Sequence, residues 1–220
     1  MKYAFFPGCS VHASAREYSM SCNAVSEVLG IELVEIPDWN CCGSIDAVYT
    51  YDPDLAISLA ARNLAIAEKM NMDLVTLCSA CFFTLSRANK LLQEDKKLKR
   101  KVTNVLNKLG LDYNGKVRIR QYLDVLINDV GLEKIAENVR VPLKELKIAP
   151  YYGCLIVRPP EITKFDDPEH PNSMERLIEA LGATPLEYTD KVRCCGASLM
   201  ITKEHIAMEM TKNLLTNAKN

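Results

Sequence analysis

The sequence predicts an α/β fold of two pseudo-repeated domains with mostly parallel sheets, the second copy being incomplete at its C-terminus. Apolar strand-like runs alternate with helical patterns, which is typical of parallel sheets with helical connections. One order of elements (strand, cysteine, helix, glycine, strand, Cys-Cys-Gly) occurs twice along the 220 residues. We therefore expect a first domain with connecting helices at residues 1–145 and a second domain at residues 146–220.

The first copy has the full set of elements. Its strands are expected at residues 3–6, 31–36 and 74–77. Its helices are expected at residues 18–29 and 53–70. On the first helix, the residues expected to share one apolar face are Tyr18, Cys22, Val25 and Leu29. Gly30 is expected to end that helix in a left-handed conformation.

The second copy repeats this order. Its strands are expected at residues 146–149 and 184–188, and its helices at residues 174–181 and 204–218. Asn172 and Glu175 have the spacing of a capping box for the first of these helices. Two amphipathic helices at residues 98–109 and 123–130, with a short strand at residues 117–119 between them, are expected to connect the copies.

Eight of the nine cysteines follow the repeat. In the first copy they stand at the junctions between strands and helices, as Cys9, Cys41, Cys42, Cys78 and Cys81. In the second copy the matching positions hold Cys154, Cys194 and Cys195. Cys78 follows Cys42 by 36 positions, and the same step from Cys195 leads to position 231, so we expect that the sequence stops before a second Cys-x-x-Cys. Cys22 lies outside the repeat on an apolar helix face and is expected to be buried.

Composition excludes several classes of function. A net charge of −1 gives no basis for binding nucleic acid or an anionic membrane. The most apolar long stretch, residues 55–67, is too short to span a bilayer and contains Arg62. Pro7 and Gly8 follow the first apolar residues too closely for a signal peptide. We therefore expect a cytoplasmic protein without a transmembrane segment, whose cysteines bind metal or carry out redox chemistry.

The arrangement of the cysteines predicts a polynuclear metal site. Thiolates are the soft ligands that iron–sulfur clusters and zinc select. Loops at the carboxyl ends of parallel strands meet at one edge of a sheet, so the five thiols of the first copy are expected to converge there. Five thiolates exceed the four ligands of a tetrahedral zinc. Helix N-termini stabilise thiolates, and Gly43 and Gly196 allow the backbone to approach a cluster closely.

The double pattern of a cysteine, Cys-Cys-Gly and Cys-x-x-Cys resembles the CCG domain of HdrB, the B-type subunit of heterodisulfide reductase. Gly-Cys-Leu-Ile-Val-Arg-Pro-Pro at residues 153–160, Phe-Asp-Asp-Pro at 165–168 and Cys-Cys-Gly-Ala-Ser at 194–198 resemble HdrB more than other CCG proteins. The resemblance covers essentially the whole chain. It implies two non-cubane 4Fe–4S clusters that face one substrate cavity. Cys9, Cys41, Cys42, Cys78 and Cys81 would ligate the first, and Cys154, Cys194 and Cys195 the second, which lacks two ligands in this sequence.

The same resemblance implies an activity and partners. Members of the family reduce the disulfide between coenzyme M and coenzyme B in methanogens, or act on related thiol chemistry. The chain would then be the catalytic iron–sulfur subunit, with the clusters held by these cysteines as the reactive groups. Its electrons would come from two partners in the heterodisulfide reductase complex, one ferredoxin-like and the other FAD-containing.

Two other functions remain open from the sequence. One is an electron relay, as a CCG subunit of a complex that oxidises lactate, glycolate or succinate. The other is a zinc-stabilised structural module without electron transfer. His12 and Trp39 lie close in sequence to Cys9 and Cys41, where they either contact the site or belong to the surface and the core.

Overall fold

The computed structural model describes residues 1–43 and 46–219. It divides the chain into two compact units, Met1–Tyr122 and Leu123–Asn220. All strand pairs in both units are parallel, which confirms the predicted α/β class. The repeat boundary expected between residues 145 and 146 stays a prediction.

The first unit contains a four-stranded parallel sheet in the order β2-β1-β3-β4. Its strands are β1 (Lys2–Phe6), β2 (Glu32–Glu35), β3 (Leu74–Thr76) and β4 (Ile119–Gln121). One row across the sheet runs through Val34, Ala4, Leu74 and Ile119. Ala4 and Leu74 in that row are fully buried, because helices cover both faces of the two central strands.

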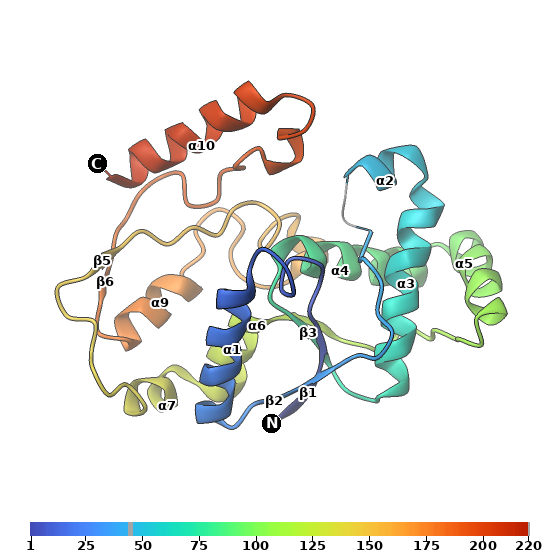
Figure 1. Cartoon of the computed structure of the whole chain (residues 1–220), viewed down its shortest axis with the longest axis horizontal. Coiled ribbons are helices and arrows are strands. Elements are labelled where there is room, and N and C mark those ends of the chain that lie inside the picture. The colour runs from blue at the N-terminus through green and yellow to red at the C-terminus, as the bar shows by residue number, and fades with distance from the viewer. Residues whose placement is uncertain (44–45, 220) are drawn as a thin grey trace. The chain divides into compact units, whose positions relative to one another are not determined.

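Helices connect these strands by crossovers on both faces of the sheet. They are α1 (Arg16–Leu29), α2 (Asp46–Tyr51), α3 (Pro53–Lys69), α4 (Ser79–Glu94) and α5 (Lys96–Lys108). Figure 1 shows α1 and α3 on opposite sides of β1 and β3. The chain leaves β1 toward β2 on one side and returns to β3 on the other, so the strand order reverses between β1 and β3. In such a sheet this reversal opens a crevice at the carboxyl ends of the strands, where ligands bind.

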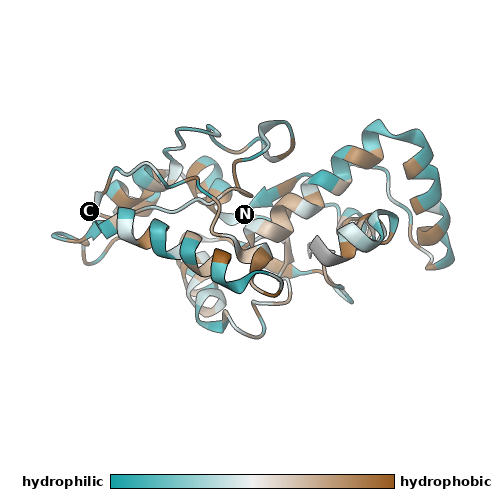
Figure 2. Ribbon diagram, turned by 90° about the horizontal axis from the view of Figure 1, so that it is seen from above, coloured by the Kyte–Doolittle hydropathy of each residue, from teal (hydrophilic) through white to brown (hydrophobic). Residues whose placement is uncertain are grey.

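The core of the first unit depends on a small-residue face of α3. Ala60, Ala61 and Ala65 are fully buried, which brings the helix backbone close to its neighbours. Asp52 caps the helix by accepting a hydrogen bond from Leu55 N at 3.0 Å. In Figure 2 the helices carry hydrophilic and hydrophobic positions in alternation, as expected for helices with one buried face. Within the described residues, no helix is long and apolar enough to cross a membrane.

The second unit has one short parallel pair of strands, β5 (Lys147–Ile148) and β6 (Thr184–Pro185). A small apolar cluster of Tyr152, Ile156, Val157 and Val192 lies beside the cysteine loops. The remaining elements are α6 (Tyr122–Val125), which begins at the last residue of the first unit, a π-helical turn (Leu126–Val130), α7 (Leu132–Glu137), α8 (Pro160–Thr163), α9 (Ser173–Ala180), a 3-10 turn (Ala197–Leu199) and α10 (Glu204–Lys219).

The buried face of α1 differs from the expected one. Cys22 and Leu29 are buried as predicted, but Val25 is 41% exposed and Tyr18 is 47% exposed. Ser26 is buried instead, because its hydroxyl is hydrogen-bonded to the Tyr122 hydroxyl at 2.7 Å. The buried face of α1 therefore depends on Tyr122, 96 positions away in the sequence. The helical periodicity of α1 gives no information about such a distant partner. Gly30 ends the helix in the predicted left-handed conformation.

The capping box expected at Asn172 and Glu175 is wrong. The Asn172 side chain makes no capping hydrogen bond to α9. Asp166 Oδ2 instead accepts hydrogen bonds from the backbone N–H groups of Asn172, at 3.0 Å, and Ser173, at 2.9 Å. The Glu175 carboxylate is engaged by Tyr152 and Lys191, so it is not available to the helix terminus.

Candidate functional site

The structure brings together the five cysteines of the first copy. Cys9 follows β1, Cys41 and Cys42 follow β2, and Cys78 immediately precedes α4, so all lie beyond the carboxyl ends of the strands. Cys42 Sγ lies 3.3 Å from Cys81 Sγ. A Cβ added to Gly8 would lie 3.1 Å from Cys81 Sγ, so the loop before Cys9 packs against the same thiol.

The thiols of this group shift one another's proton affinity. A hydrogen bond from Cys81 lowers the pKa of Cys78 to about 6, with help from the backbone N–H groups at the start of α4 and against the effect of burial. Hydrogen bonds with Cys42 and Cys78, together with burial, raise the pKa of Cys81. Burial raises the pKa of Cys41, and the nearby thiols of Cys42 and Cys9 add to this rise. The five thiols thus form one interacting group.

Gly43 allows the first Cys-Cys pair to lie directly against α3. Its φ is +79°, a conformation that other residues adopt only with strain. A Cβ at this position would lie 2.7 Å from the backbone oxygen of Ala56, closer than real Cβ contacts come. Glycine is therefore required by both its backbone angle and its surroundings.

The second copy also brings its cysteines together. Burial raises the pKa of Cys154, and the thiols of Cys194 and Cys195 add to the rise, which places the three side chains near one another. Gly196 N donates a hydrogen bond to Cys194 Sγ at 3.4 Å. Gly196 has φ +78°, and a Cβ there would lie 3.1 Å from Ala207 Cα in α10. In both Cys-Cys-Gly turns, the glycine therefore packs against an alanine of a helix that follows in the chain.

An aromatic and acidic group borders the first thiol site. The His12 ring stacks on Trp39 with centroids 5.8 Å apart, and His12 Nε2 lies 3.4 Å from Glu35 Oε1. Trp39 Nε1 donates to the same Glu35 oxygen at 2.8 Å, and its ring meets Phe6 edge-on. These contacts join the loop that carries Cys9 to the loop that carries Cys41.

Two tyrosines beside the thiols, Tyr18 and Tyr151, were not predicted to belong to the site. Tyr18 is 47% exposed as a whole, but the partial burial of its hydroxyl raises its pKa, and its hydrogen bond with Cys22 and the proximity of Cys78 contribute. Burial also raises the pKa of Tyr151, with further contributions from Cys195 and Cys154. Tyr151 stands within the repeated segment before Cys154, where the first copy has Phe6, so comparing the two copies position by position was the signal that could have identified it.

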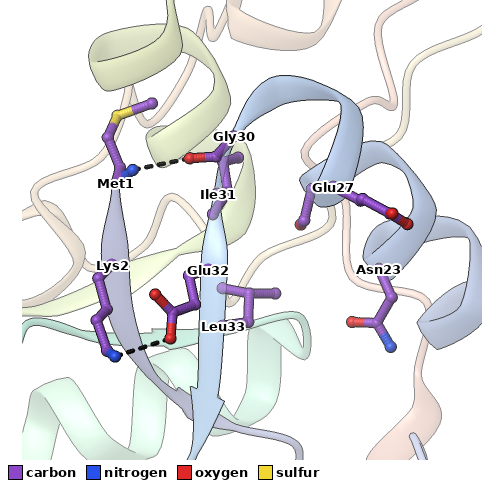
Figure 3. A pocket seen from close by; sticks show the side chains of 9 residues that line it. Met1, Lys2, Asn23, Glu27, Gly30, Ile31, Glu32 and Leu33 are labelled. Atoms are coloured by element: carbon purple, nitrogen blue, oxygen red, sulfur yellow. Dashed lines mark hydrogen bonds and ion pairs between the residues drawn. The ribbon is translucent and has the colours of Figure 1, made fainter.

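A hollow of about 690 Å³ lies at the opposite edge of the sheet (Figure 3). It is lined by residues at the amino ends of β1 and β2 and by α1, without any cysteine. The Met1 amino group donates to Gly30 O at 2.7 Å, and Lys2 pairs with Glu32 at 2.7 Å at its border. The hollow and the thiols therefore lie at different ends of the strands.

The donor set fits an iron–sulfur cluster. All nine cysteines lie within the described residues, and none of them forms a disulfide there. Soft thiolates are the ligands that such clusters select, and the backbone N–H groups at the start of α4 stabilise the thiolate of Cys78. Within residues 1–43 and 46–219, no three His, Cys, Asp or Glu side chains are placed to bind a single metal ion.

Comparison with known proteins gives the family. The family described as CCG, cysteine-rich domain, matches residues 3–86 and 148–220. The HdrB protein of a "Ferredoxin/F(420)H(2)-dependent CoB-CoM heterodisulfide reductase" of Methanosarcina acetivorans is 30% identical over 100% of this chain and 73% of its own length. The chain belongs to the CCG cysteine-rich domain family and, within it, to the HdrB group.

The curated relatives of this chain are named as subunits of different enzymes. An "8-methylmenaquinol:fumarate reductase membrane anchor subunit" of Wolinella succinogenes is 37% identical over 99% of this chain and 75% of its own length. The crystal structure of a hypothetical protein from Helicobacter pylori is similar in fold, with a TM-score of 0.67 and 14% identity over 92% of this chain. This chain spans about three quarters of the two curated relatives and 36% of the Helicobacter pylori chain.

Proposed function

We propose that this CCG protein is the catalytic iron–sulfur subunit of a heterodisulfide reductase, which reduces the disulfide of coenzyme M and coenzyme B, or a related disulfide, to two thiols. The observation that carries the proposal is the paired arrangement of thiols. Five lie together in the first unit and three in the second, and each set includes the pair of a Cys-Cys-Gly turn whose glycine has a positive φ, +79° at Gly43 and +78° at Gly196. The whole-chain similarity to HdrB of Methanosarcina acetivorans supports the same conclusion.

The residues divide into holding and positioning roles. Cys9, Cys41, Cys42, Cys78 and Cys81 would hold a first non-cubane 4Fe–4S cluster, and Cys154, Cys194 and Cys195 would supply ligands to a second. Bound clusters would supply the one-electron transfers that a disulfide needs. Gly43 and Gly196 let the two Cys-Cys-Gly turns pack closely against α3 and α10, and Trp39 packs edge-on against Phe6.

The proposed reaction consumes two electrons and two protons for each disulfide cleaved. The sulfur–sulfur bond breaks, and each sulfur leaves as a thiol. The electrons must reach the thiol sets from a donor protein. We propose as partners the ferredoxin-like subunit and the FAD-containing subunit of a heterodisulfide reductase complex, in the cytoplasm.

A second function, electron relay, is favoured by one specific observation. The relative from Wolinella succinogenes, at 37% identity, is a subunit of a fumarate reductase. In such a complex this chain would pass electrons along without splitting a disulfide. The cysteine clusters would be the same, and the difference would lie in the substrate.

The test begins with anaerobically purified protein. Iron, zinc and acid-labile sulfide are measured, followed by reduction of the mixed coenzyme M–coenzyme B disulfide with a reduced viologen dye as electron donor. We expect about four irons for each occupied site, with matching sulfide. Zinc without sulfide contradicts the proposal, whereas iron and sulfide without disulfide reduction indicate the electron relay.

Two variants test the assignment of the ligands. Cys42→Ala is expected to lose the iron of the first site together with activity, because Cys42 is buried among the five thiols. Cys22→Ala is the matched control, since Cys22 is also buried in the same unit but lies on α1 outside the thiol group. Loss of iron in both variants, or in neither, argues against the assignment.

A further inference from the structure

Lys191 joins the two cysteine loops of the second unit through its main chain. Its carbonyl oxygen accepts hydrogen bonds from Tyr152 N at 2.8 Å and Gly153 N at 3.1 Å. Gly153 directly precedes Cys154, and Lys191 lies three residues before Cys194. The hydroxyl of Tyr151 also donates to Arg193 O at 2.7 Å. The segment before Cys154 is thus tied to the segment before the Cys-Cys pair at three points.

The Lys191 side chain anchors this junction in a buried polar network. Its ammonium group donates to Glu175 Oε1 at 2.6 Å and to Pro171 O at 2.9 Å. Glu175 Oε2 accepts a hydrogen bond from the Tyr152 hydroxyl at 2.5 Å, and that hydroxyl accepts one from Met174 N at 2.6 Å. Lys191, Glu175 and Tyr152 are 9%, 6% and 4% exposed. The network therefore links both cysteine loops to the start of α9.

Stability alone does not explain a buried ion pair at this place. Removing two charges from water carries a penalty that their attraction offsets only with good geometry and further hydrogen bonds. Replacing such a pair by well-packed apolar residues is often neutral or stabilising, so the pair is weak evidence for stability. Here each charged group has more than one partner, and the partners belong to three separate chain segments. The observed arrangement of the loops satisfies these groups together.

The first copy does not share this network. Pro7 stands at the position of Tyr152, and Asp38 stands three residues before Cys41, at the position of Lys191. Asp38 is held instead by Arg62, which donates to its carbonyl and carboxylate oxygens. In both copies the residue three positions before the Cys-Cys pair is fixed by an ion pair, but it is an acid, Asp38, in the first copy and a base, Lys191, in the second. The network is specific to the second thiol set.

We propose that Lys191, with Glu175 and Tyr152, is a positioning residue that sets the spacing between Cys154 and the Cys194–Cys195 pair. The network holds the three thiols near one another and leaves the thiol set of the first unit unaffected. This inference depends on the proposed function only for the identity of the group that the thiols bind. The spacing itself is a property of the chain and is measured in the metal-free, reduced protein.

The experiment measures thiol spacing by cross-linking with dibromobimane, which bridges thiols a few ångströms apart, followed by peptide mass spectrometry. The yield of the link from Cys154 to Cys194 or Cys195 is compared among variants. The link between Cys42 and Cys81, whose sulfurs lie 3.3 Å apart, is the control within each molecule. Lys212→Met, at an exposed lysine of α10, is the control for removing a charge from the second unit.

We expect Lys191→Met and Glu175→Gln to lower the Cys154 link at least fivefold, without a change in the Cys42–Cys81 link. Lys191→Arg is expected to retain at least half of the wild-type yield, because its guanidinium group can still reach the carboxylate. Tyr152→Phe, which removes one hydroxyl, is expected to lower the yield about twofold. Wild-type yields in Lys191→Met overturn the proposal.

A double variant separates positioning from folding. Lys191→Met with Glu175→Leu replaces the ion pair by apolar groups of similar volume, a change that other proteins tolerate without loss of stability. We expect its thermal unfolding midpoint to stay at the wild-type value while the Cys154 link remains at least fivefold lower. Recovery of the link in this variant shows that packing sets the spacing, and the proposal fails. If the wild type binds no iron but these yields change as expected, the proposed function fails and the positioning role stands.

Discussion

Replacing Gly43 by alanine tests whether close approach of the first Cys-Cys-Gly to α3 is a structural requirement. Gly43 has φ +79°, and its added Cβ would lie 2.7 Å from Ala56 O and 3.3 Å from Ala56 Cα. Both neighbouring atoms belong to the backbone of a helix, so neither can rotate away. The turn, the helix or both must shift, and the turn carries Cys41 and Cys42.

Gly30 provides the matched control in the same unit. Its φ is +72°, but an added Cβ there meets nothing within 4 Å. Gly30→Ala therefore carries only the left-handed strain, about 1–2 kcal/mol. Gly43→Ala carries the same strain and an overpacking cost of about 1–3 kcal/mol. We expect destabilisation of about 2–5 kcal/mol for Gly43→Ala, larger than for Gly30→Ala.

The assay uses urea unfolding of the metal-free, reduced protein followed by tryptophan fluorescence. Trp39 is the one tryptophan of the sequence, so its signal reports the first unit. Unfolding midpoints at a common slope give the difference in free energy between the variants. Equal destabilisation by the two substitutions refutes the close-approach argument. In the loaded protein, Gly43→Ala is also expected to lower the iron content, whereas Gly30→Ala is not.

Three further predictions concern the first unit. In the metal-free protein the pKa of Cys78 is about 6, below its ordinary value of 9.0. The Cys78 thiolate therefore stabilises the folded state fully above about pH 9, and this contribution is lost as the pH falls through 6. Alkylation mapped by mass spectrometry is expected to be half-maximal at Cys78 near pH 6, and modification only near pH 9 contradicts this. Leu85→Ala, at a fully buried position, is expected to cost about 2–5 kcal/mol in urea unfolding, and Leu109→Ala, 57% exposed, much less; similar costs contradict the assigned burial. Asp95 accepts hydrogen bonds from Lys97 N and Leu98 N at the start of α5. Asp95→Ala is expected to cost about 1 kcal/mol by the same measurement and Asp95→Asn little, whereas a neutral Asp95→Ala argues against the cap.

Elements with strong local signals could be predicted from the sequence. The helix expected at residues 53–70 is α3, Pro53–Lys69, because Asp52 provides the cap and proline is compatible with a first helical position. The strand expected at residues 74–77 is β3, Leu74–Thr76. The convergence of the first five thiols could also be predicted, since parallel strands place their following loops at one edge.

Features that depend on distant partners could not be predicted. Val25 was expected to be buried on α1, but the buried position is Ser26, which is hydrogen-bonded to Tyr122. Glu175 was expected to cap α9, but its carboxylate is bound by Lys191, 16 positions along the chain. In each case a polar side chain took the partner that folding brought to it, and local spacing carries no information about such partners.

The sequence by itself determined the chemistry of this protein, because thiols, glycines and their repeated order are properties of the chain. It also determined the parallel α/β class, since the alternation of short apolar runs and amphipathic helices permits little else. Only the tertiary structure decided which thiols interact, with Cys42 on Cys81 in one unit and Cys154 beside Cys194 and Cys195 in the other. The tertiary structure also pairs Lys191 with Glu175, which lies on a different segment of the chain. A buried charge needs an oppositely charged partner, and only the fold determines which residue is close enough to provide it.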